Sequence, residues 1–236
     1  MTWLPELAVA ILAAVLAITL HEAAHGYAAL ALGDDTARRA GRLSLNPLRH
    51  VDRVGTVLVP GVLLLGQLLT VGRVEFLFGW ARPVPVDIRA LRNPRVGMML
   101  VAAAGPAMNF ALAWVAGLLV HPLEAWAGLL PEGAYDWALR FLVLSILANL
   151  VLALFNLLPV PPLDGGRILA GLLPRPLALP YMRLERWGLL IVLGGVFLLP
   201  RLVEGFDPVG WALRHVVSEA FGLVLLLSGN GTGGGA

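Results

Sequence analysis

The chain of 236 residues is 58% apolar and only 14% charged, which excludes an ordinary soluble domain and indicates a membrane protein. Its 17 basic residues are all arginine, against 15 acidic residues, and they lie beside apolar stretches rather than among aromatic residues. They therefore predict membrane orientation and no nucleic-acid partner. Cysteine is absent, which excludes disulfides and thiolate metal ligands.

The first apolar segment, residues 5–30, predicts a membrane span that ends at Gly33 and carries the motif His21-Glu22-Ala23-Ala24-His25. Residues four apart lie on one face of a helix, so both histidines can bind one metal ion, while Glu22 is placed to act on a metal-bound water. A pair of structural histidines is the alternative. Ionisable groups at membrane depth are functional candidates by default, so the sequence predicts a zinc site inside a membrane.

Arginines decide the predicted orientation. Residues 34–53 hold five arginines against three aspartates, which places this loop in the cytoplasm and the motif in the cytoplasmic half of the membrane. Residues 54–72 are apolar but interrupted by Pro60 and Gly61, and arginines flank both sides. A re-entrant hairpin, or a span with a short returning loop through residues 76–80, therefore fits better than a simple span.

The segment of residues 81–87, Ala-Arg-Pro-Val-Pro-Val-Asp, contains two prolines, which predict an extended backbone. This segment could be a strand-like edge beside the site, with which an unwound substrate pairs. A plain connecting loop is an equally good interpretation of the same residues.

Further spans are predicted at residues 96–120, 138–158 and about 184–200, and residues 209–228 form either a span or an interfacial helix. The sequence thus predicts an all-α polytopic membrane protein with four to six transmembrane helices and a re-entrant or short β-like loop near the active site. Asn109, in the segment at residues 96–120, needs a polar partner in the bilayer, and a packing role is preferred to direct chemistry.

The end of the span at 138–158 returns to the cytoplasmic side, where Asp164 precedes two glycines. A carboxylate there can complete a two-histidine, one-carboxylate zinc site with an open position. Alone, an aspartate before glycine is usually a turn cap, but a two-histidine site that lacks its third ligand favours the metal. Asn156 is either a packing residue or a hydrogen-bond donor to a developing oxyanion.

The chain resembles the site-2 protease family of intramembrane zinc metalloproteases, peptidase family M50, in three separated motifs that keep the family's order. They are His21-Glu22-Ala23-Ala24-His25, Gly105-Pro106-x-x-Asn109 and Asn156-x-x-Pro159-x-x-Pro162-Leu163-Asp164-Gly165. Residues 42–47 and 79–86 also resemble the compact bacterial and archaeal members, so no PDZ or CBS domain is expected.

The resemblance implies that His21, His25 and Asp164 bind one Zn²⁺ per chain, that Glu22 is the general base, and that Asn156 assists substrate or transition-state binding. It implies hydrolysis of peptide bonds within transmembrane segments of membrane proteins, as in regulated intramembrane proteolysis. The expected location is the bilayer of a bacterial or archaeal plasma membrane, with the active site toward the cytoplasmic side. No oligomeric state is predicted.

The resemblance covers residues from about 5 to 173, which gives an expected catalytic core at 1–173, additional membrane helices at 174–228 and a flexible glycine-rich tail at 229–236. Two other functions fit the same residues: a non-catalytic membrane scaffold that retains a structural metal, and a membrane zinc hydrolase of small peptides or lipids. A transporter is disfavoured because paired half-repeats with broken helices are absent from the sequence.

Overall fold

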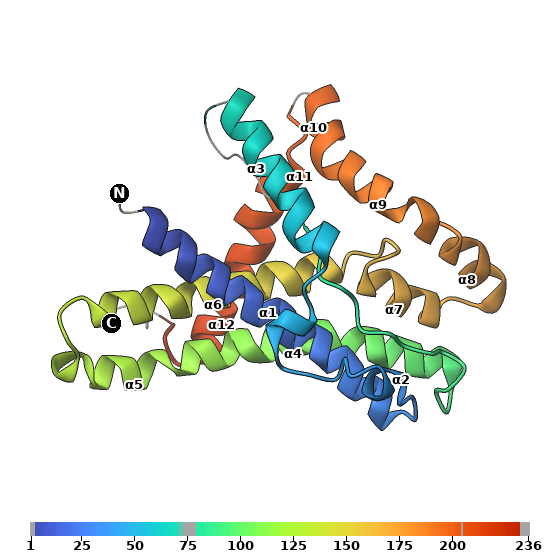
Figure 1. Ribbon diagram of the computed structural model, residues 1–236, viewed down its shortest axis with the longest axis horizontal. Helices are drawn as coiled ribbons and strands as arrows, with labels where there is room; N and C mark the ends of the chain where they lie inside the picture. The colour runs from blue at the N-terminus through green and yellow to red at the C-terminus, as the bar shows by residue number, and fades with distance from the viewer. Residues whose placement is uncertain (1–2, 71, 73–78, 204, 232–236) are drawn as a thin grey trace.

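The computed structural model describes residues 3–70, 72, 79–203 and 205–231, and all regular secondary structure within them is helical. Three long helices form the body of the protein: α1 (Trp3–Ala31), α4 (Pro94–Leu118) and α6 (Ala134–Asn156). Helices α4 and α6 lie side by side and antiparallel, and α1 crosses both of them (Figure 1). The prediction of an all-α polytopic membrane fold is confirmed.

Five helical runs in the described part of the chain are long and apolar enough to cross a membrane, which agrees with the predicted four to six. They are Pro5–Ala31, Arg53–Thr70, Pro94–Ala125, Ala134–Asn156 and Pro208–Leu227. The helix expected near residues 184–200 forms as α9 (Glu185–Leu193), η4 (Gly194–Leu198) and α10 (Leu199–Leu202), but it is not among the five. Three charged residues, at 185, 186 and 201, make this run less suited to the hydrocarbon core.

Small residues hold the bundle together. Ala13 and Ala17 of α1 and Ala113 of α4 are at most 1% exposed. Small side chains let helix backbones approach closely. Because lipid tails are as apolar as the side chains, membrane helices associate through this close van der Waals packing and not through the hydrophobic effect. Ile146 and Leu150 of α6 fill the remaining space in the cluster that contains Ala113. The bundle therefore fixes the histidine face of α1 against α4.

Residues 53–70 form one helix, and the chain lies beside the start of that helix again at residue 80. The helix consists of η2 (Arg53–Leu58) and α3 (Val59–Thr70) and is continuous, so the predicted interruption at Pro60 and Gly61 is wrong. A π-helical turn just before the proline accommodates it. The N–H of Trp80 donates to the carbonyl oxygen of Gly55 (3.1 Å), so the chain has returned to the start of the helix by residue 80. This geometry satisfies the charge bias; the predicted returning residues 76–78 lie outside the described part.

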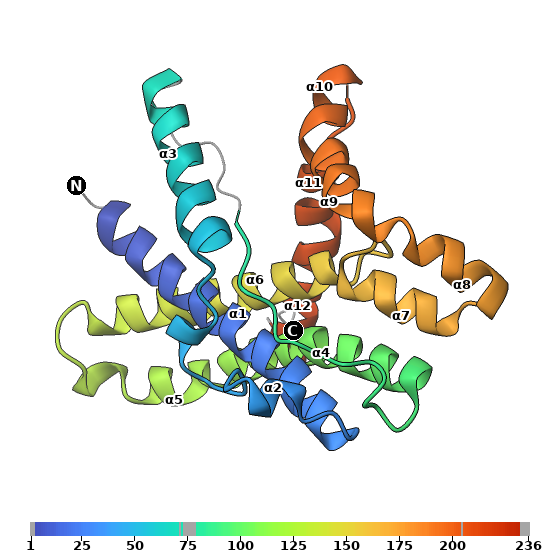
Figure 2. The ribbon, with the colours of Figure 1, turned by 45° about the vertical axis from the view of Figure 1, so that its right-hand side comes forward.

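The remaining helices are short or follow the bundle. They are α2 (Thr36–Arg39), η1 (Pro47–Arg49), α5 (Val120–Ala125), η3 (Ala127–Leu129), α7 (Asp164–Leu172), α8 (Arg175–Met182), α11 (Pro208–Trp211), η5 (Ala212–Val217) and α12 (Ser218–Leu227). Figure 2 shows α3 and the α9–α10 helix standing away from the bundle on the same side. At the other end of the bundle, Asn230 Nδ2 donates to the carbonyl oxygen of Gly117 (2.7 Å), which ties the chain after α12 to α4.

Candidate metal centre

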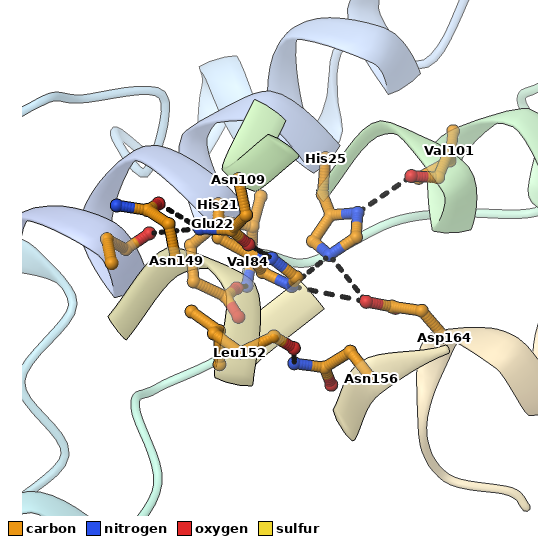
Figure 3. A network of polar contacts seen from close by, with 11 residues as sticks. His21, Glu22, His25, Val84, Val101, Asn109, Asn149, Leu152, Asn156 and Asp164 are labelled. Carbon is orange, nitrogen blue, oxygen red and sulfur yellow. Dashed lines mark hydrogen bonds and ion pairs between the residues drawn. The ribbon is translucent and has the colours of Figure 1, made fainter. Parts of the chain in front are cut away.

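Three potential ligands converge between α1 and α7. His21 and His25 are one turn apart on α1, and Asp164 is the first residue of α7 (Figure 3). The Nε2 atoms of the two histidines are 3.0 Å apart, and Asp164 Oδ2 lies 3.2 Å from that of His21 and 3.3 Å from that of His25. All three side chains are largely buried. The structure thus brings together the three residues that the sequence predicted as metal ligands.

This arrangement fits zinc. In a tetrahedral site with zinc–nitrogen and zinc–oxygen distances of about 2.0 to 2.1 Å, the ligand atoms lie about 3.3 to 3.4 Å from one another. The three separations of 3.0 to 3.3 Å agree with that spacing. Asp164 Oδ2 is buried without a hydrogen-bond partner in the described part of the chain, which is costly for a carboxylate oxygen. A divalent cation would satisfy this oxygen and both nitrogens together.

The other ring nitrogen of each histidine is held by a second residue. His21 Nδ1 donates to Asn109 Oδ1 (2.5 Å), and His25 Nδ1 donates to the carbonyl oxygen of Val101 (2.7 Å). A proton held on Nδ1 leaves the Nε2 lone pair for a metal and fixes the plane of the ring. Asn109 therefore has two roles. It is fully buried and packs between helices, as predicted, and it also orients the ligand His21.

Asn109 is itself fixed by an amide that the sequence analysis missed. Its Nδ2 donates to Asn149 Oδ1 (2.7 Å), and Asn149 Nδ2 donates to the carbonyl oxygen of Ser145 (2.8 Å) within α6. The only signal for Asn149 in the sequence was a second amide in an apolar helix, which needs a partner in a bilayer. This chain of amides turns the oxygen of Asn109, and not its nitrogen, toward His21.

Two glycine residues, Gly105 and Gly165, leave space for this metal centre. A Cβ atom on Gly105 would lie 2.5 Å from Cε1 and Nε2 of His25 and 2.6 Å from Cε1 of His21, closer than any side chain allows. A Cβ atom on Gly165 would lie 2.2 Å from the carbonyl oxygen of Leu157. Glycine at these positions lets α4 approach both imidazoles and lets α7 present Asp164 beside the end of α6.

Glu22 lies beside the three ligands and outside their cluster. Its Oε2 accepts a hydrogen bond from the backbone N–H of Val84 (2.9 Å). Glu22 and His21 both line two cavities, one of about 430 Å³ and one of about 240 Å³. The smaller cavity also contains His25 and Asp164. A water molecule in these cavities can therefore reach the glutamate and the ligand cluster together.

The extended segment at residues 79–86 passes directly along this site. The backbone N–H groups of Trp80 and Arg82 donate to the carbonyl oxygens of Gly55, in η2, and of His50, and the N–H of Val84 donates to Glu22 Oε2. Successive residues of an extended chain point their N–H and C=O groups in opposite directions, so Ala81 points the other way. Ala81 lines the larger cavity. The segment is extended as predicted, and it pairs with no strand among the described residues.

Asn156 is the last residue of α6 and lines both cavities. Its Nδ2 donates to the carbonyl oxygen of Leu152 (3.0 Å), one turn back in the same helix. Burial raises the pKa of the nearby Asp164 carboxyl, but its interactions with the adjacent His21 and His25 outweigh burial and lower the pKa to about 2. The Asp164 carboxylate is therefore ionised at neutral pH. The role of Asn156 in catalysis stays a prediction.

Membrane-length helices around a buried cluster of two histidines and an aspartate define the chain as a multi-pass membrane metalloprotein. Its relatives narrow the class. Residues 119–193 match the model of peptidase family M50. The chain is 39% identical over 203 residues to "Putative zinc metalloprotease YwhC" of Bacillus subtilis, an alignment that covers 83% of this chain and 86% of the relative. The chain therefore belongs to peptidase family M50, the site-2 protease family, and is a zinc metalloprotease by that membership.

A more distant relative supports the same family. The chain is 31% identical over 158 residues to "Putative zinc metalloprotease Rip2" of Mycobacterium tuberculosis, which covers 64% of this chain and 52% of Rip2. The alignment thus spans about half the length of Rip2. No solved structure matches the chain significantly.

Proposed function

We propose that this protein is an intramembrane zinc endopeptidase that hydrolyses peptide bonds within transmembrane segments of membrane proteins. One zinc ion per chain is held by His21, His25 and Asp164. The observation that carries the proposal is the meeting of these three ligand atoms, within 4.8 Å of one another, beside Glu22 and against a helix of membrane-spanning length that supplies both histidines. A purely structural zinc site would be expected to be closed by four protein ligands, whereas the described residues supply three.

Glu22 is the general base of the proposed reaction. Zinc bound at the site would supply Lewis acidity, which favours ionisation of water and polarises a carbonyl group. The Glu22 carboxylate accepts the proton of the attacking water and passes it to the leaving amine. Its hydrogen bond from the Val84 N–H keeps one oxygen fixed, so the other faces the cavity. Asn156 lines both cavities, and the second hydrogen of its Nδ2, beside the one bonded to Leu152, would donate to the developing oxyanion.

The substrate must unwind before it reacts, because a helix hides its carbonyl groups in hydrogen bonds between residues four apart. The extended segment at residues 79–86 provides a partner for an unwound stretch. Ala81 lines the larger cavity, and neither its N–H nor its C=O forms a hydrogen bond in the described part of the chain. Pro83 and Pro85 lack an N–H, so pairing through donors on this side ends at Ala81.

The proposed location is a bacterial or archaeal plasma membrane with the metal centre toward the cytoplasm. His25 lies six residues before the end of α1, which corresponds to a depth of about 9 Å along the helix. The arginine-rich residues 38–53 follow that end, as the positive-inside rule requires for a cytoplasmic loop. Water reaches the site from this side through the smaller cavity.

The test is cleavage of two peptides that share one cleavable sequence, a membrane-spanning one in proteoliposomes and a short soluble one. We expect cleavage of the spanning peptide only, and its loss in Glu22→Gln with zinc content unchanged. Glu219→Gln, the same chemical change at an exposed position of α12, is the matched control and should cleave normally. Equal cleavage of both peptides would favour the small-peptide hydrolase, and no cleavage of either would favour the scaffold.

A further inference from the structure

A further cavity, of about 620 Å³, lies next to the metal centre between the start of α4 and the helices α7 and α8. Figure 2 shows α7 and α8 beside each other at the end of the molecule where α4 begins. Most of its lining is apolar and includes Ile88, Met98, Leu179 and Met182. The proposed hydrolysis does not use this space.

Three arginines line this apolar cavity, and they make it basic. The lining contains one carboxylate, that of Glu185. Together with the three guanidinium groups, of Arg95, Arg167 and Arg175, it gives the lining a net charge of +2. Arg167 Nη2 lies 3.5 Å from Glu185 Oε1, a loose ion pair between partly exposed side chains. Arginine guanidinium groups beside an apolar surface favour an anion, and planar forked donors suit the oxygens of a phosphate best.

The guanidinium group of Arg175 is available to a ligand. Arg175, at the start of α8, forms no hydrogen bond or ion pair with any residue that the structure describes. Arg95 is committed only in part: its Nε donates to the carbonyl oxygen of Gly171 (2.8 Å) and its Nη2 to that of Leu173. These bonds hold the end of α7 and leave one amino group of Arg95 for a ligand.

The cavity lies at the boundary of the hydrocarbon core. Arg95 is the second residue of a helical run long and apolar enough to span a membrane. Helices α7 and α8 expose large apolar side chains next to it: Leu172 is 65%, Leu177 56% and Leu179 70% exposed. Exposed leucines beside arginines are typical of a helix that lies in the interface between head groups and acyl chains. A ligand at this place meets both a charged and an oily environment.

We propose that this cavity binds an anionic glycerophospholipid, with its phosphate on Arg175 and Arg167 and the upper part of one acyl chain along Met98 and Leu179. A basic pocket between helices at the cytoplasmic boundary is how membrane proteins select anionic head groups. A free phosphate would leave the apolar lining uncovered, and a zwitterionic lipid would bring its own cation toward the arginines. The proposal concerns lipid binding and stands whether or not the chain cleaves transmembrane segments.

The bound lipid would also contact the catalytic part of the molecule. Val84, Val86 and Arg167 line both this cavity and the smaller cavity of the metal centre. Arg167 follows Asp164 by one turn of α7. A lipid on Arg167 would therefore hold α7 and the extended segment in place without touching the metal ligands.

The experiment uses the full-length, zinc-loaded protein in nanodiscs of phosphatidylcholine with a minor fraction of phosphatidylglycerol. Lipids that remain bound after transfer to detergent are identified and counted by native mass spectrometry. We expect one phosphatidylglycerol per chain to be retained in preference to phosphatidylcholine. Arg175→Gln should weaken its retention about fivefold, and Arg167→Gln together with Arg175→Gln about 25-fold. Arg183→Gln, an exposed arginine just after α8 that does not line the cavity, is the matched control and should retain the lipid as the unchanged protein does.

Four results would overturn the proposal. Equal retention of both lipids by the unchanged protein would show no anion selectivity, and undiminished retention in the double variant would place the lipid elsewhere. Displacement of the lipid by inorganic phosphate would reduce the site to a simple anion site. Selective binding of an acidic membrane peptide, with no lipid preference, would assign the cavity to a peptide instead. Zinc content, measured on each variant, shows whether α7 is still folded around the metal centre.

Discussion

Replacing Asn109 by alanine tests whether the buried amides orient the metal ligands. The substitution removes the acceptor, 2.5 Å away, that holds the Nδ1 proton of His21, and it removes the donor, 2.7 Å away, that satisfies Asn149 Oδ1. His21 can then rotate or carry its proton on Nε2, where it blocks zinc. Loss of such a supporting partner weakens metal binding about 10- to 100-fold.

This loss corresponds to about 1.4 to 2.7 kcal/mol of zinc binding free energy. The assay is competition for zinc between detergent-solubilised protein and a chelator of known affinity, with helix content measured on the same samples. Asn149→Ala is the graded control, because it acts on His21 only through Asn109 and should weaken binding less. Unchanged zinc affinity in a folded Asn109→Ala variant would refute the reasoning, and equal effects of both variants would point to general loosening of the bundle.

Three further predictions follow from the site. Gly105→Ala should abolish or strongly reduce zinc binding, because its Cβ would overlap the His25 ring at 2.5 Å, whereas Gly128→Ala, which meets nothing within 4 Å, should bind zinc normally; chelator competition measures both. In the zinc-free protein the Asp164 carboxyl should stay ionised until the pH approaches its pKa of about 2; the infrared C=O band that Asp164→Asn removes measures this, and protonation near pH 4 would contradict it. Arg42→Ala should lower peptide cleavage several-fold while zinc stays bound, because Arg42 Nη2 donates to the Arg82 carbonyl oxygen (2.6 Å) and holds the extended segment; equal loss of zinc would refute a positioning role.

The ligand pair and the bundle could be predicted because both follow from local sequence. Two histidines four residues apart share a helix face wherever they occur, and apolar runs of span length form helices in a bilayer. Asp164 could be predicted only by combining its place after α6 with the orientation given by the arginines. Its approach to His21 and His25 is a tertiary contact, and the tight packing of Gly165 on Leu157 that secures it carries no periodic signal.

The support of the ligands could not be predicted for the same reason. Asn109 was recognised as a polar group in need of a partner, but the sequence does not say whether that partner is His21, Asn149 or a backbone carbonyl group. Val101 binds His25 through its carbonyl oxygen, so its side chain gives no hint of the role. Contacts made by backbone atoms across helices are independent of residue type.

The helix at residues 53–70 shows how local propensity can mislead. Pro60 and Gly61 disfavour a continuous helix, and in water they would be expected to interrupt it. In a bilayer an open backbone has no water to bind, so the helix continues and a π-helical turn absorbs the proline. The charge argument, which required both ends on one side, was the better guide to this segment.

The zinc content per chain shows directly whether α1 and α7 build one metal site; it is measured on the purified protein and on His25→Ala and Asp164→Ala. We expect one zinc ion in the unchanged protein and its loss from both variants, because α1 and α7 supply one cluster. Asp136→Ala, at an exposed position in the first turn of α6, is the matched control and should retain the zinc. Full zinc in Asp164→Ala would contradict the account, since Asp164 would then be a turn cap and the third ligand another residue.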